Sequence, residues 1–175
     1  STLFPYTTLF PSTTSHEALA AARELGLDVI VLDHHQAPVA LPDALVINPN
    51  RQDDLSGQGI LCAAGVVFLA LVSLNRALQD LGWWNEDRRS PDLLAALDLV
   101  ALATVADVAP LTGLNRAFVV QGLKVLSNRH RVGLAALLAV SRLEGPLKAQ
   151  HLGFALGPRI NAGGRIGDAS LGCRL

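Results

Sequence analysis

The stretch that decides the fold is residues 24–35, which read ELGLDVIVLDHH. Before it, Thr14 and Glu17 have the spacing of a capping box, which predicts a helix that begins at Thr14. Gly26 is typical of the position just after a helix end, so the helix is expected to stop there. The apolar, β-branched run 28–32 then predicts a short buried strand.

A second strand is expected at 44–47, after a loop bounded by prolines. Helix, glycine and strand in this order form the αβ half of a βαβ unit, so the two strands should be parallel. Ser90-Pro91 is typical of a helix start, and apolar spacing continues beyond it. The expected helices cover 61–81, 90–102, 114–127, 132–141 and 147–155. The predicted fold class is therefore α/β, a parallel sheet flanked by helices with a mostly helical C-terminal half.

Composition narrows the class of protein. The chain has 175 residues, of which 50% are hydrophobic and 17% charged. This balance excludes a disordered tail and a coiled coil, and the length suits one domain or a piece of one.

The longest apolar stretch, 61–74, contains Gly65 and Ser73 and is shorter than the roughly 20 residues of a bilayer crossing, so no membrane partner is expected. Cys62 and Cys173 have neither metal-type spacing nor a disulfide framework, which favours the reducing cytoplasm.

The two ends of the sequence look unlike the rest. Thr-Leu-Phe-Pro occurs at 2–5 and again at 8–11, with no strand or helix period. We therefore interpret residues 1–12 as a non-native or truncated leader and exclude them from the fold. The chain lacks an initiator Met and stops in mid-pattern, so residues 13–175 are expected to be a partial domain that ends near a missing C-terminal domain.

Charge is divided unevenly along the chain. Residues 1–114 carry 13 acidic and 5 basic residues, whereas residues 115–175 carry 9 basic and 2 acidic ones. Arg supplies 12 of the 14 bases, and a guanidinium pairs well with phosphate oxygens. An acidic half beside a basic half suits a metal-dependent enzyme that acts on a polyanion. Ordinary solvated helix faces would give the same counts.

Asp33, His34 and His35 follow directly on the strand 28–32. In open α/β sheets, ligands bind beyond the carboxyl ends of the strands, so the triplet lies where a site is expected. Imidazole nitrogen and carboxylate oxygen together suit Mn²⁺, and Mg²⁺ where carboxylates dominate. The alternative is a polar turn without a metal.

Asp107 is a second candidate, since it is a single carboxylate in the apolar stretch 104–110. A buried carboxylate needs a partner or a cation, so Asp107 is expected to have one. The alternative is a helix-end position exposed to water. Asp98 competes with it, but is expected to face solvent on a helix.

The third candidate is the stretch 157–167, which contains four glycines and a proline. Glycines allow a close approach of the backbone, and Arg159, Asn161 and Arg165 offer donors for an anion. The stretch lacks both the dinucleotide fingerprint and the P-loop pattern. An interdomain hinge is the other interpretation.

In this order, the three features resemble the DHH phosphoesterase superfamily and, within it, the RecJ-type single-strand-specific DNA exonucleases. The matching runs are the strand with Asp33-His34-His35, residues 48–66, residues 103–108, and Gly157-Pro158-Arg159-Ile160-Asn161-Ala162. The resemblance covers nearly everything from Thr14 onward. Asp-His-His by itself identifies only the superfamily, whereas the last run indicates the RecJ branch.

The resemblance implies a role for each candidate. His34 and Asp107 would be metal ligands, His35 would face the scissile phosphate, and Asp33 would orient the cluster. Arg159, Asn161 and Arg165 would contact the phosphates of single-stranded DNA. Two Mn²⁺ or Mg²⁺ ions would activate a water for in-line attack, and nucleotides would be released from a 5′ end. A single-strand-binding protein is a possible partner.

Three departures from the family pattern accompany this resemblance. The upstream Asp-x-Asp-x-Asp-Gly cluster and a further Asp before Thr14 are both missing, and Gly163 replaces an Ala. The chain alone is therefore expected to be inactive. Two other functions stay open: a DHH phosphoesterase acting on pyrophosphate, oligonucleotides or cyclic dinucleotides, and a binding module that serves as a replication scaffold.

Overall fold

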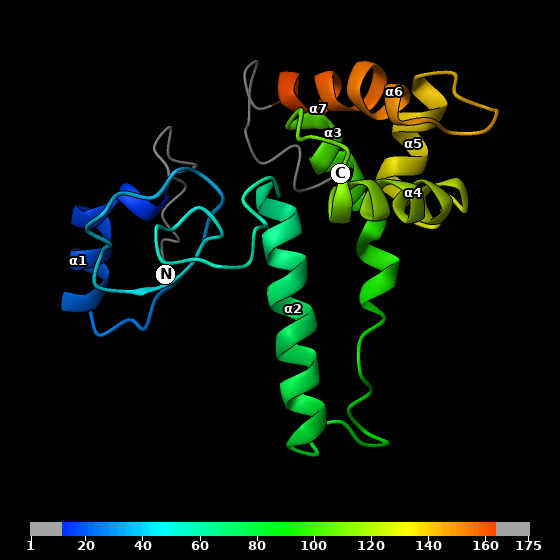
Figure 1. The fold of residues 1–175 in the computed structure, drawn as a ribbon. Helices are drawn as coiled ribbons and strands as arrows, with labels where there is room; N and C mark the ends of the chain where they lie inside the picture. Colours follow the sequence, from blue (N-terminus) through cyan, green and yellow to red (C-terminus); the bar gives the residue numbers. More distant parts are fainter. Residues whose placement is uncertain (1–11, 164–175) are drawn as a thin grey trace. The chain divides into compact units, whose positions relative to one another are not determined.

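The computed structural model describes residues 12–163, and these fall into two compact units that divide after Gly59. The first contains the turn η1 (Ser12–Thr14), helix α1 (His16–Glu24) and strands β1 (Ile30–Leu32) and β2 (Leu45–Ile47). In the described part of the second unit, all the regular elements are helices, joined by loops (Figure 1). Its elements are α2 (Ala63–Asp80), η2 (Leu93–Ala96), α3 (Leu97–Ala106), α4 (Gly113–Ser127), α5 (Val132–Val140), α6 (Ala149–His151), η3 (Leu152–Leu156) and α7 (Gly157–Gly163).

The two strands of the first unit are parallel, as predicted. Ile30 pairs with Leu45, and Leu32 pairs with Ile47. The central residues Val31 and Val46 are both buried, which fits strands rich in β-branched residues. Both strands are shorter than the sequence predicted, and they form the only sheet within the described residues. The fold class is thus a helix-rich α/β structure with a small parallel sheet.

The predicted start of α1 is wrong by one residue. Ser15, not Thr14, precedes the helix, and no side-chain cap is formed there. Thr13 and Thr14 lie instead in η1, where the Thr13 hydroxyl donates to Asp33. This long-range bond competes with the local capping box. The predicted end is confirmed, because Gly26 follows the helix with a positive φ of 72°.

The predicted helix start at Ser90-Pro91 is also wrong. Asp92 is the residue before η2, and its carboxylate accepts a hydrogen bond from the Leu94 amide. The Ser90 hydroxyl donates instead to the side chain of Asn75. Asp caps helices as well as Ser does, so two capping residues separated only by Pro91 left the boundary ambiguous.

The second unit has two apolar clusters, both of which include residues of α3. One joins α3 and α4 to α5 and η3, and consists of Ala101, Leu102, Val119, Leu126, Leu134, Leu138, Leu152 and Leu156. The other consists of Leu61, Val66, Phe68, Leu97, Val100 and Phe118. In it, the rings of Phe68 and Phe118 pack edge to face at 5.3 Å between centroids. Leucine and valine therefore supply most of the core.

Helix α2 is 18 residues long and apolar enough to cross a membrane by length and composition alone, and it is the one such helix among residues 12–163. The 14-residue apolar stretch 61–74 was used to argue against a bilayer crossing, but the helix continues to Asp80 and passes the test of length and composition. Length and composition are weak indications, because core helices of soluble proteins pass the same test. Val66 and Phe68 of α2 are buried in the second cluster.

Gly122 allows α3 and α4 to approach each other closely. A Cβ atom at this position would lie 2.1 Å from the Leu97 carbonyl oxygen and 2.4 Å from the Ala101 Cβ. We expect Gly122→Ala to destabilise the protein by about 1–3 kcal/mol, because overpacking outweighs the gain in helix propensity. Urea denaturation measures the change.

Gly145→Ala is the matched control, since a Cβ there meets nothing within 4 Å. A Gly122→Ala protein as stable as this control would contradict close packing at Gly122.

Candidate functional site

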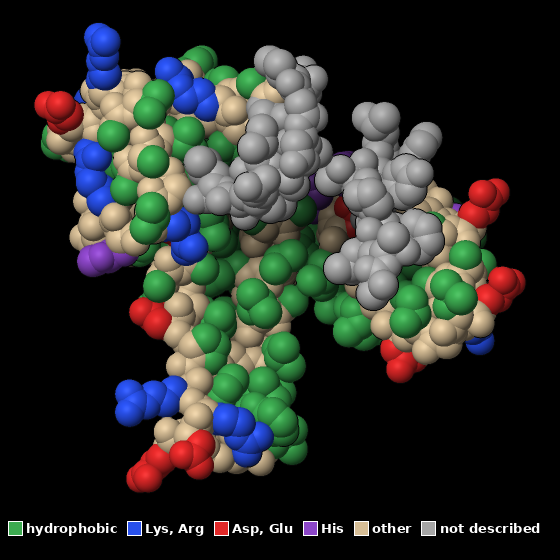
Figure 2. All heavy atoms as spheres, turned by 180° about the vertical axis from the view of Figure 1, so that it is seen from behind, with side chains coloured by type: hydrophobic (Ala, Val, Ile, Leu, Met, Phe, Trp, Pro, Cys, Tyr) green, Lys and Arg blue, Asp and Glu red, His purple; other side chains and the backbone are tan. Residues whose placement is uncertain are grey.

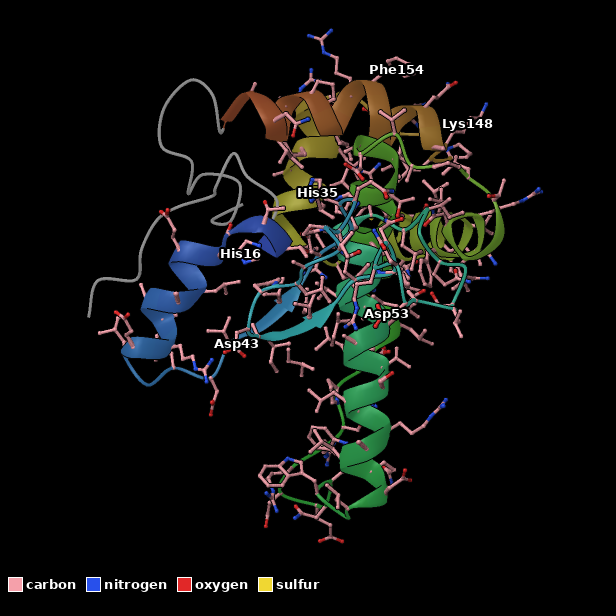
Figure 3. All side chains as sticks on the ribbon, turned by 60° about the vertical axis from the view of Figure 1, so that its left-hand side comes forward. His16, His35, Asp43, Asp53, Lys148 and Phe154 are labelled. Atoms are coloured by element: carbon pink, nitrogen blue, oxygen red, sulfur yellow. The ribbon has the colours of Figure 1, made fainter. Side chains whose placement is uncertain are left out.

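The first group of candidate residues lies at the carboxyl end of the sheet. Asp33, His34 and His35 follow β1, and Asn48 and Asn50 follow β2. The strands are parallel, so these two loops leave the same edge. In Figure 3, His35 lies at this edge and Asp43, which precedes β2, lies at the other.

The Asp33 carboxylate is buried and fully engaged by hydrogen bonds from the protein. Its Oδ2 atom accepts from the backbone amide of Thr13 at 2.9 Å and from the Thr13 hydroxyl at 2.5 Å. Its Oδ1 atom accepts from the amides of His34 at 2.7 Å and His35 at 3.2 Å. The Nδ1 atom of the His35 ring lies 2.7 Å from the same oxygen. Asp33 is 3% exposed, so these groups replace its hydration.

These bonds keep Asp33 ionised. Burial by itself would raise the pKa of Asp33, but the hydrogen bonds from Thr13 and His35 outweigh it and hold that pKa well below its usual range. An ionised carboxylate only accepts hydrogen bonds, so the His35 Nδ1 atom must be the donor. The Nε2 atom of His35 is then the nitrogen with a lone pair. The side chain of His35 is 54% exposed, which leaves the ring accessible.

His34 lies beside His35, with 4.5 Å between the ring centroids and an angle of 52° between the planes. Its side chain is half-buried. The two rings are therefore neighbours that come from one loop, and both depend on the backbone of residues 33–35.

Asn48 and Asn50 bind this loop. From the sequence, both were placed in a run that matches the family, but neither of them was given a role. Asn48 Nδ2 donates to the His35 carbonyl oxygen at 2.9 Å. Asn50 Nδ2 donates to the His34 carbonyl oxygen at 2.7 Å. Their position just after β2, at the edge where a site was expected, is a signal that could have identified them.

Asp107 lies in the second unit, at the end of α3. It is the C-cap residue, its amide donates to the Ala103 carbonyl oxygen, and its side chain is exposed. The expectation that Asp107 is buried is therefore wrong, and the alternative of an exposed helix-end position describes it. The apolar neighbours of Asp107 point into the core from α3, whereas the aspartate follows the last helical residue.

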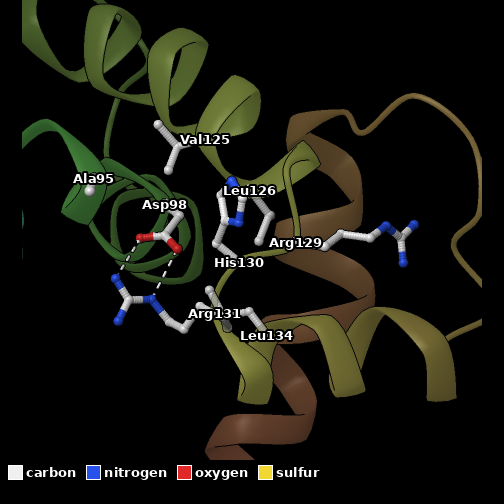
Figure 4. Close-up of a pocket in the computed structure, with 8 residues that line it drawn as sticks. All are labelled: Ala95, Asp98, Val125, Leu126, Arg129, His130, Arg131 and Leu134. Atoms are coloured by element: carbon white, nitrogen blue, oxygen red, sulfur yellow. Dashed lines mark hydrogen bonds and ion pairs between the residues drawn. The ribbon is translucent and has the colours of Figure 1, made fainter.

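Asp98 is the buried carboxylate of α3, and the expectation that it faces solvent is wrong. Its side chain is 5% exposed and pairs with Arg131. Arg131 Nε donates to Oδ2 at 3.0 Å, and Nη2 donates to Oδ1 at 3.2 Å (Figure 4). This two-pronged ion pair neutralises the charge, so Asp98 has a structural partner.

Arg159 and Asn161 are both exposed, and both lie in α7. Residues two apart on a helix point in different directions, so the structure does not bring these two side chains together. The glycine-rich loop or hinge expected from residue 157 is helical instead up to Gly163. Pro158 follows directly on the π-helical turn η3, which continues into α7, so an irregular turn of the helix precedes the residue that has no amide to donate. Arg165 lies outside the described residues.

The donor types at these positions suit a divalent transition metal, since imidazole nitrogen and carboxylate oxygen both bind Mn²⁺. Asp33 is saturated by protein donors, which leaves His34 and His35 as the candidates of the first unit. Asp107 is a candidate of the second. Across residues 12–163, no three His, Cys, Asp or Glu side chains gather closely enough to hold an ion.

Thr13→Val removes one donor to Asp33 and should destabilise the protein by about 1–3 kcal/mol, since the buried carboxylate loses a partner. The pKa of Asp33 in the folded state lies below its unfolded value of about 3.9. Its stabilising contribution is therefore present above about pH 4 and is lost as the pH falls through the folded-state pKa. The loss begins near the unfolded-state pKa in both proteins, but with one donor fewer the folded-state pKa of Asp33 lies closer to that value, so the loss of stability on acidification should be smaller in Thr13→Val. Urea denaturation of the metal-free protein between pH 3 and 7 checks both effects, and equal behaviour of Thr13→Val and the hydroxyl-retaining control Thr13→Ser would contradict them.

Arg131→Met leaves the buried Asp98 without its cation. We expect a loss of about 1–3 kcal/mol, less than for a fully buried pair because the Arg131 side chain is 42% exposed. The double variant Asp98→Leu/Arg131→Met should recover most of the loss in urea denaturation. The exposed Arg116 provides the control Arg116→Met. If Arg131→Met unfolds at the same urea concentration as this control, the ion pair contributes no stability.

Comparisons with known proteins agree with the expected resemblance. The DHH family, N-terminal domain, matches residues 11–104. The single-stranded-DNA-specific exonuclease RecJ of Salmonella typhimurium is 46% identical over 166 residues, which are 93% of this chain and 29% of that protein. The RecJ of Escherichia coli is 44% identical over the same shares.

Solved structures show the same likeness. A crystal structure of RecJ in complex with Mn²⁺ from Thermus thermophilus has a TM-score of 0.76 and 38% identity, and the match covers 93% of this chain and 23% of that one. A second structure, of exonuclease RecJ bound to manganese, has the same TM-score and identity. The chain spans less than a third of the length of these curated relatives. Because the DHH family, N-terminal domain, matches more than half of its residues, the chain belongs to the DHH family.

Proposed function

We propose that the whole protein is a metal-dependent exonuclease that hydrolyses the phosphodiester bonds of single-stranded DNA from the 5′ end. The observation that carries this proposal is the Asp33-His34-His35 loop at the carboxyl edge of the sheet, with two imidazoles side by side. Membership of the DHH family and 46% identity to a RecJ exonuclease support the substrate class.

His34 and Asp107 are the proposed metal ligands, and the manganese in the RecJ structures supports Mn²⁺ or Mg²⁺ as the ion. When bound, two such ions would supply an acidified water and a clamp for the attacking and leaving oxygens. Each ligand is positioned within its own unit. The His34 backbone is held at both ends of the residue, by Asp33 at the amide and by Asn50 at the carbonyl.

Asp33 and His35 are the proposed catalytic pair. Asp33 accepts a hydrogen bond from the Nδ1–H group of His35, and this bond sets the plane of the ring. The ring presents Nε2 on its other side, where it would face the scissile phosphate. In the protonated form, Nε2–H would donate to a phosphate oxygen, and Asp33 would stabilise the charge of the imidazolium.

The proposed substrate contacts come from the C-terminal region, from Arg159, Asn161 and Arg165. The charge balance of residues 115–175 supports contact with a phosphate backbone. On the face shown in Figure 2, Lys and Arg side chains are spread over the helical unit rather than gathered in one patch. Such spacing suits an extended strand better than a compact anion.

We further propose that residues 13–175 are part of a DHH domain and that this part alone is inactive, because His34 and Asp107 by themselves supply too few ligands for two ions. Of the residues 1–12 predicted to be a leader, 1–11 lie outside the described residues and Ser12 lies in η1, and the origin of the segment stays a prediction. A cytoplasmic location and a single-strand-binding protein as partner also stay predictions from the sequence.

Nuclease assays on the full-length protein that contains this chain test the function. With Mn²⁺ present, we expect mononucleotides from 5′-labelled single-stranded DNA and little product from duplex DNA. His34→Ala and Asp107→Ala should each lower the rate at least 100-fold, because a lost metal ligand removes transition-state stabilisation. His16→Ala and Asp87→Ala are matched controls at exposed positions and should leave the rate unchanged.

Hydrolysis of pyrophosphate or cyclic dinucleotides in place of DNA would favour the other phosphoesterase function. Binding of DNA without hydrolysis, at every Mn²⁺ concentration, would favour a scaffold. Either result would overturn the proposed exonuclease.

A further inference from the structure

We propose that Asn48 and Asn50 are positioning residues, which hold the backbone of the two histidines and so fix how the imidazoles are presented. This inference rests on the proposed function and deepens it. In this role the two asparagines act through the carbonyl groups of His34 and His35, to which their side-chain amides donate.

Asn48 is a buried link between the two loops, at 3% exposure. Its Nδ2 atom donates to the His35 carbonyl oxygen at 2.9 Å and to the Thr13 hydroxyl at 3.1 Å. Its Oδ1 atom accepts from the Asn50 amide at 2.8 Å. Both ends of the amide are therefore used. The Thr13 hydroxyl that Asn48 binds is the one that donates to Asp33, so Asn48 contacts the histidine loop and the group that anchors it.

Asn50 binds His34 in the way that Asn48 binds His35, through a side-chain amide that donates to the backbone carbonyl oxygen. Its Nδ2 atom donates to the His34 carbonyl oxygen at 2.7 Å and to the Gly59 carbonyl oxygen at 2.9 Å. Its Oδ1 atom accepts from the exposed Gln36 side chain at 3.2 Å. The Asn50 carbonyl oxygen accepts from the Ala37 amide at 3.3 Å, so the two loops are joined at a third point.

The space at Gly59 is a separate observation that supports the role of Asn50. A Cβ atom on Gly59 would lie 2.5 Å from Asn50 Oδ1 and 3.3 Å from Asn50 Cγ. A side chain at 59 would therefore displace the Asn50 amide. Glycine at this position leaves the amide where it reaches both carbonyl groups.

The chemistry of these contacts explains why asparagine is required. The loop after β1 has left the sheet, so the carbonyl groups of His34 and His35 need donors from elsewhere. A side-chain amide supplies two N–H donors and one acceptor from a short, stiff stem. Aspartate has the same shape, but it would place a carboxylate against a carbonyl oxygen. Outer contacts of this kind alter metal affinity or activity by about 10–100-fold when removed.

The decisive experiment compares Asn50→Ala with Gln36→Ala in the full-length protein. Gln36→Ala removes only the contact to Asn50 Oδ1 and leaves both Nδ2 bonds in place. We expect Asn50→Ala to lower kcat about 10-fold or more and to raise the Mn²⁺ concentration for half-maximal rate about 10-fold. KM for DNA should stay within about twofold, since the contacts to the DNA backbone are untouched. Gln36→Ala should change none of the three.

Two measurements that need no turnover separate this inference from the proposed function. Titration with Mn²⁺ alone gives the affinity, which Asn50→Ala should weaken. Amide hydrogen exchange of residues 33–36 in metal-free protein should speed up at least 10-fold in Asn50→Ala and in Gly59→Ala, which displaces the amide without removing it. A protein without nuclease activity would defeat the proposed function, while the exchange rates would still test the positioning role.

Unchanged exchange and unchanged kcat in both Asn50→Ala and Gly59→Ala would overturn the inference. So would a rise in KM for DNA with kcat and the Mn²⁺ dependence intact, because it would make Asn50 a substrate contact. Asn48→Asp provides a second variant of similar shape in case an alanine variant fails to fold. It should reproduce the loss of kcat, since it cannot donate to the His35 carbonyl oxygen.

Discussion

The buried, ionised carboxylate of Asp33 is the interaction on which the first unit depends. It gathers donors from three parts of the chain: the turn before α1 through Thr13, the backbone of the histidine loop, and the ring of His35. An unpaired carboxylate at 3% exposure would be costly, so these donors are a condition of the fold as well as of the site. The same bonds fix the orientation of His35. The stability of the first unit and the orientation of His35 therefore depend on the same hydrogen bonds to Asp33.

In the second unit, the buried aspartate has a structural role and the aspartate proposed as a metal ligand is exposed. Asp98 is buried and neutralised by Arg131, so it serves packing between α3 and the start of α5. Asp107 comes one residue after α3 ends, with an exposed side chain. A carboxylate at a helix end can reach a ligand without the desolvation that a buried one requires. This contrast supports Asp107 rather than Asp98 as the ligand that the family resemblance implies.

The sequence predicted those parts of the fold that local chemistry determines. The parallel strands, the end of α1 at Gly26 and the helix 114–127 were predicted from the spacing of apolar residues and from glycines or prolines that end an element. It failed where a long-range partner overrides a local signal. Thr13, next to the predicted cap Thr14, donates to Asp33, which lies 20 residues away, and the helix begins one residue later than predicted. Similarly, Asp98 is buried because Arg131 reaches it across 33 residues. No local pattern contains either partner, and the roles of Asn48 and Asn50 were hidden for the same reason.

The most direct test of the Asp33 anchor is the tautomer of His35, observed by long-range ¹H–¹⁵N NMR of the histidine rings in the metal-free protein at alkaline pH. An ionised Asp33 accepts only, so the account predicts a proton on Nδ1 and a bare Nε2 in His35. The Asp33→Ala variant should release this preference. A proton on Nε2 in the unmodified protein would contradict the account, because Nδ1 could then not donate to Asp33.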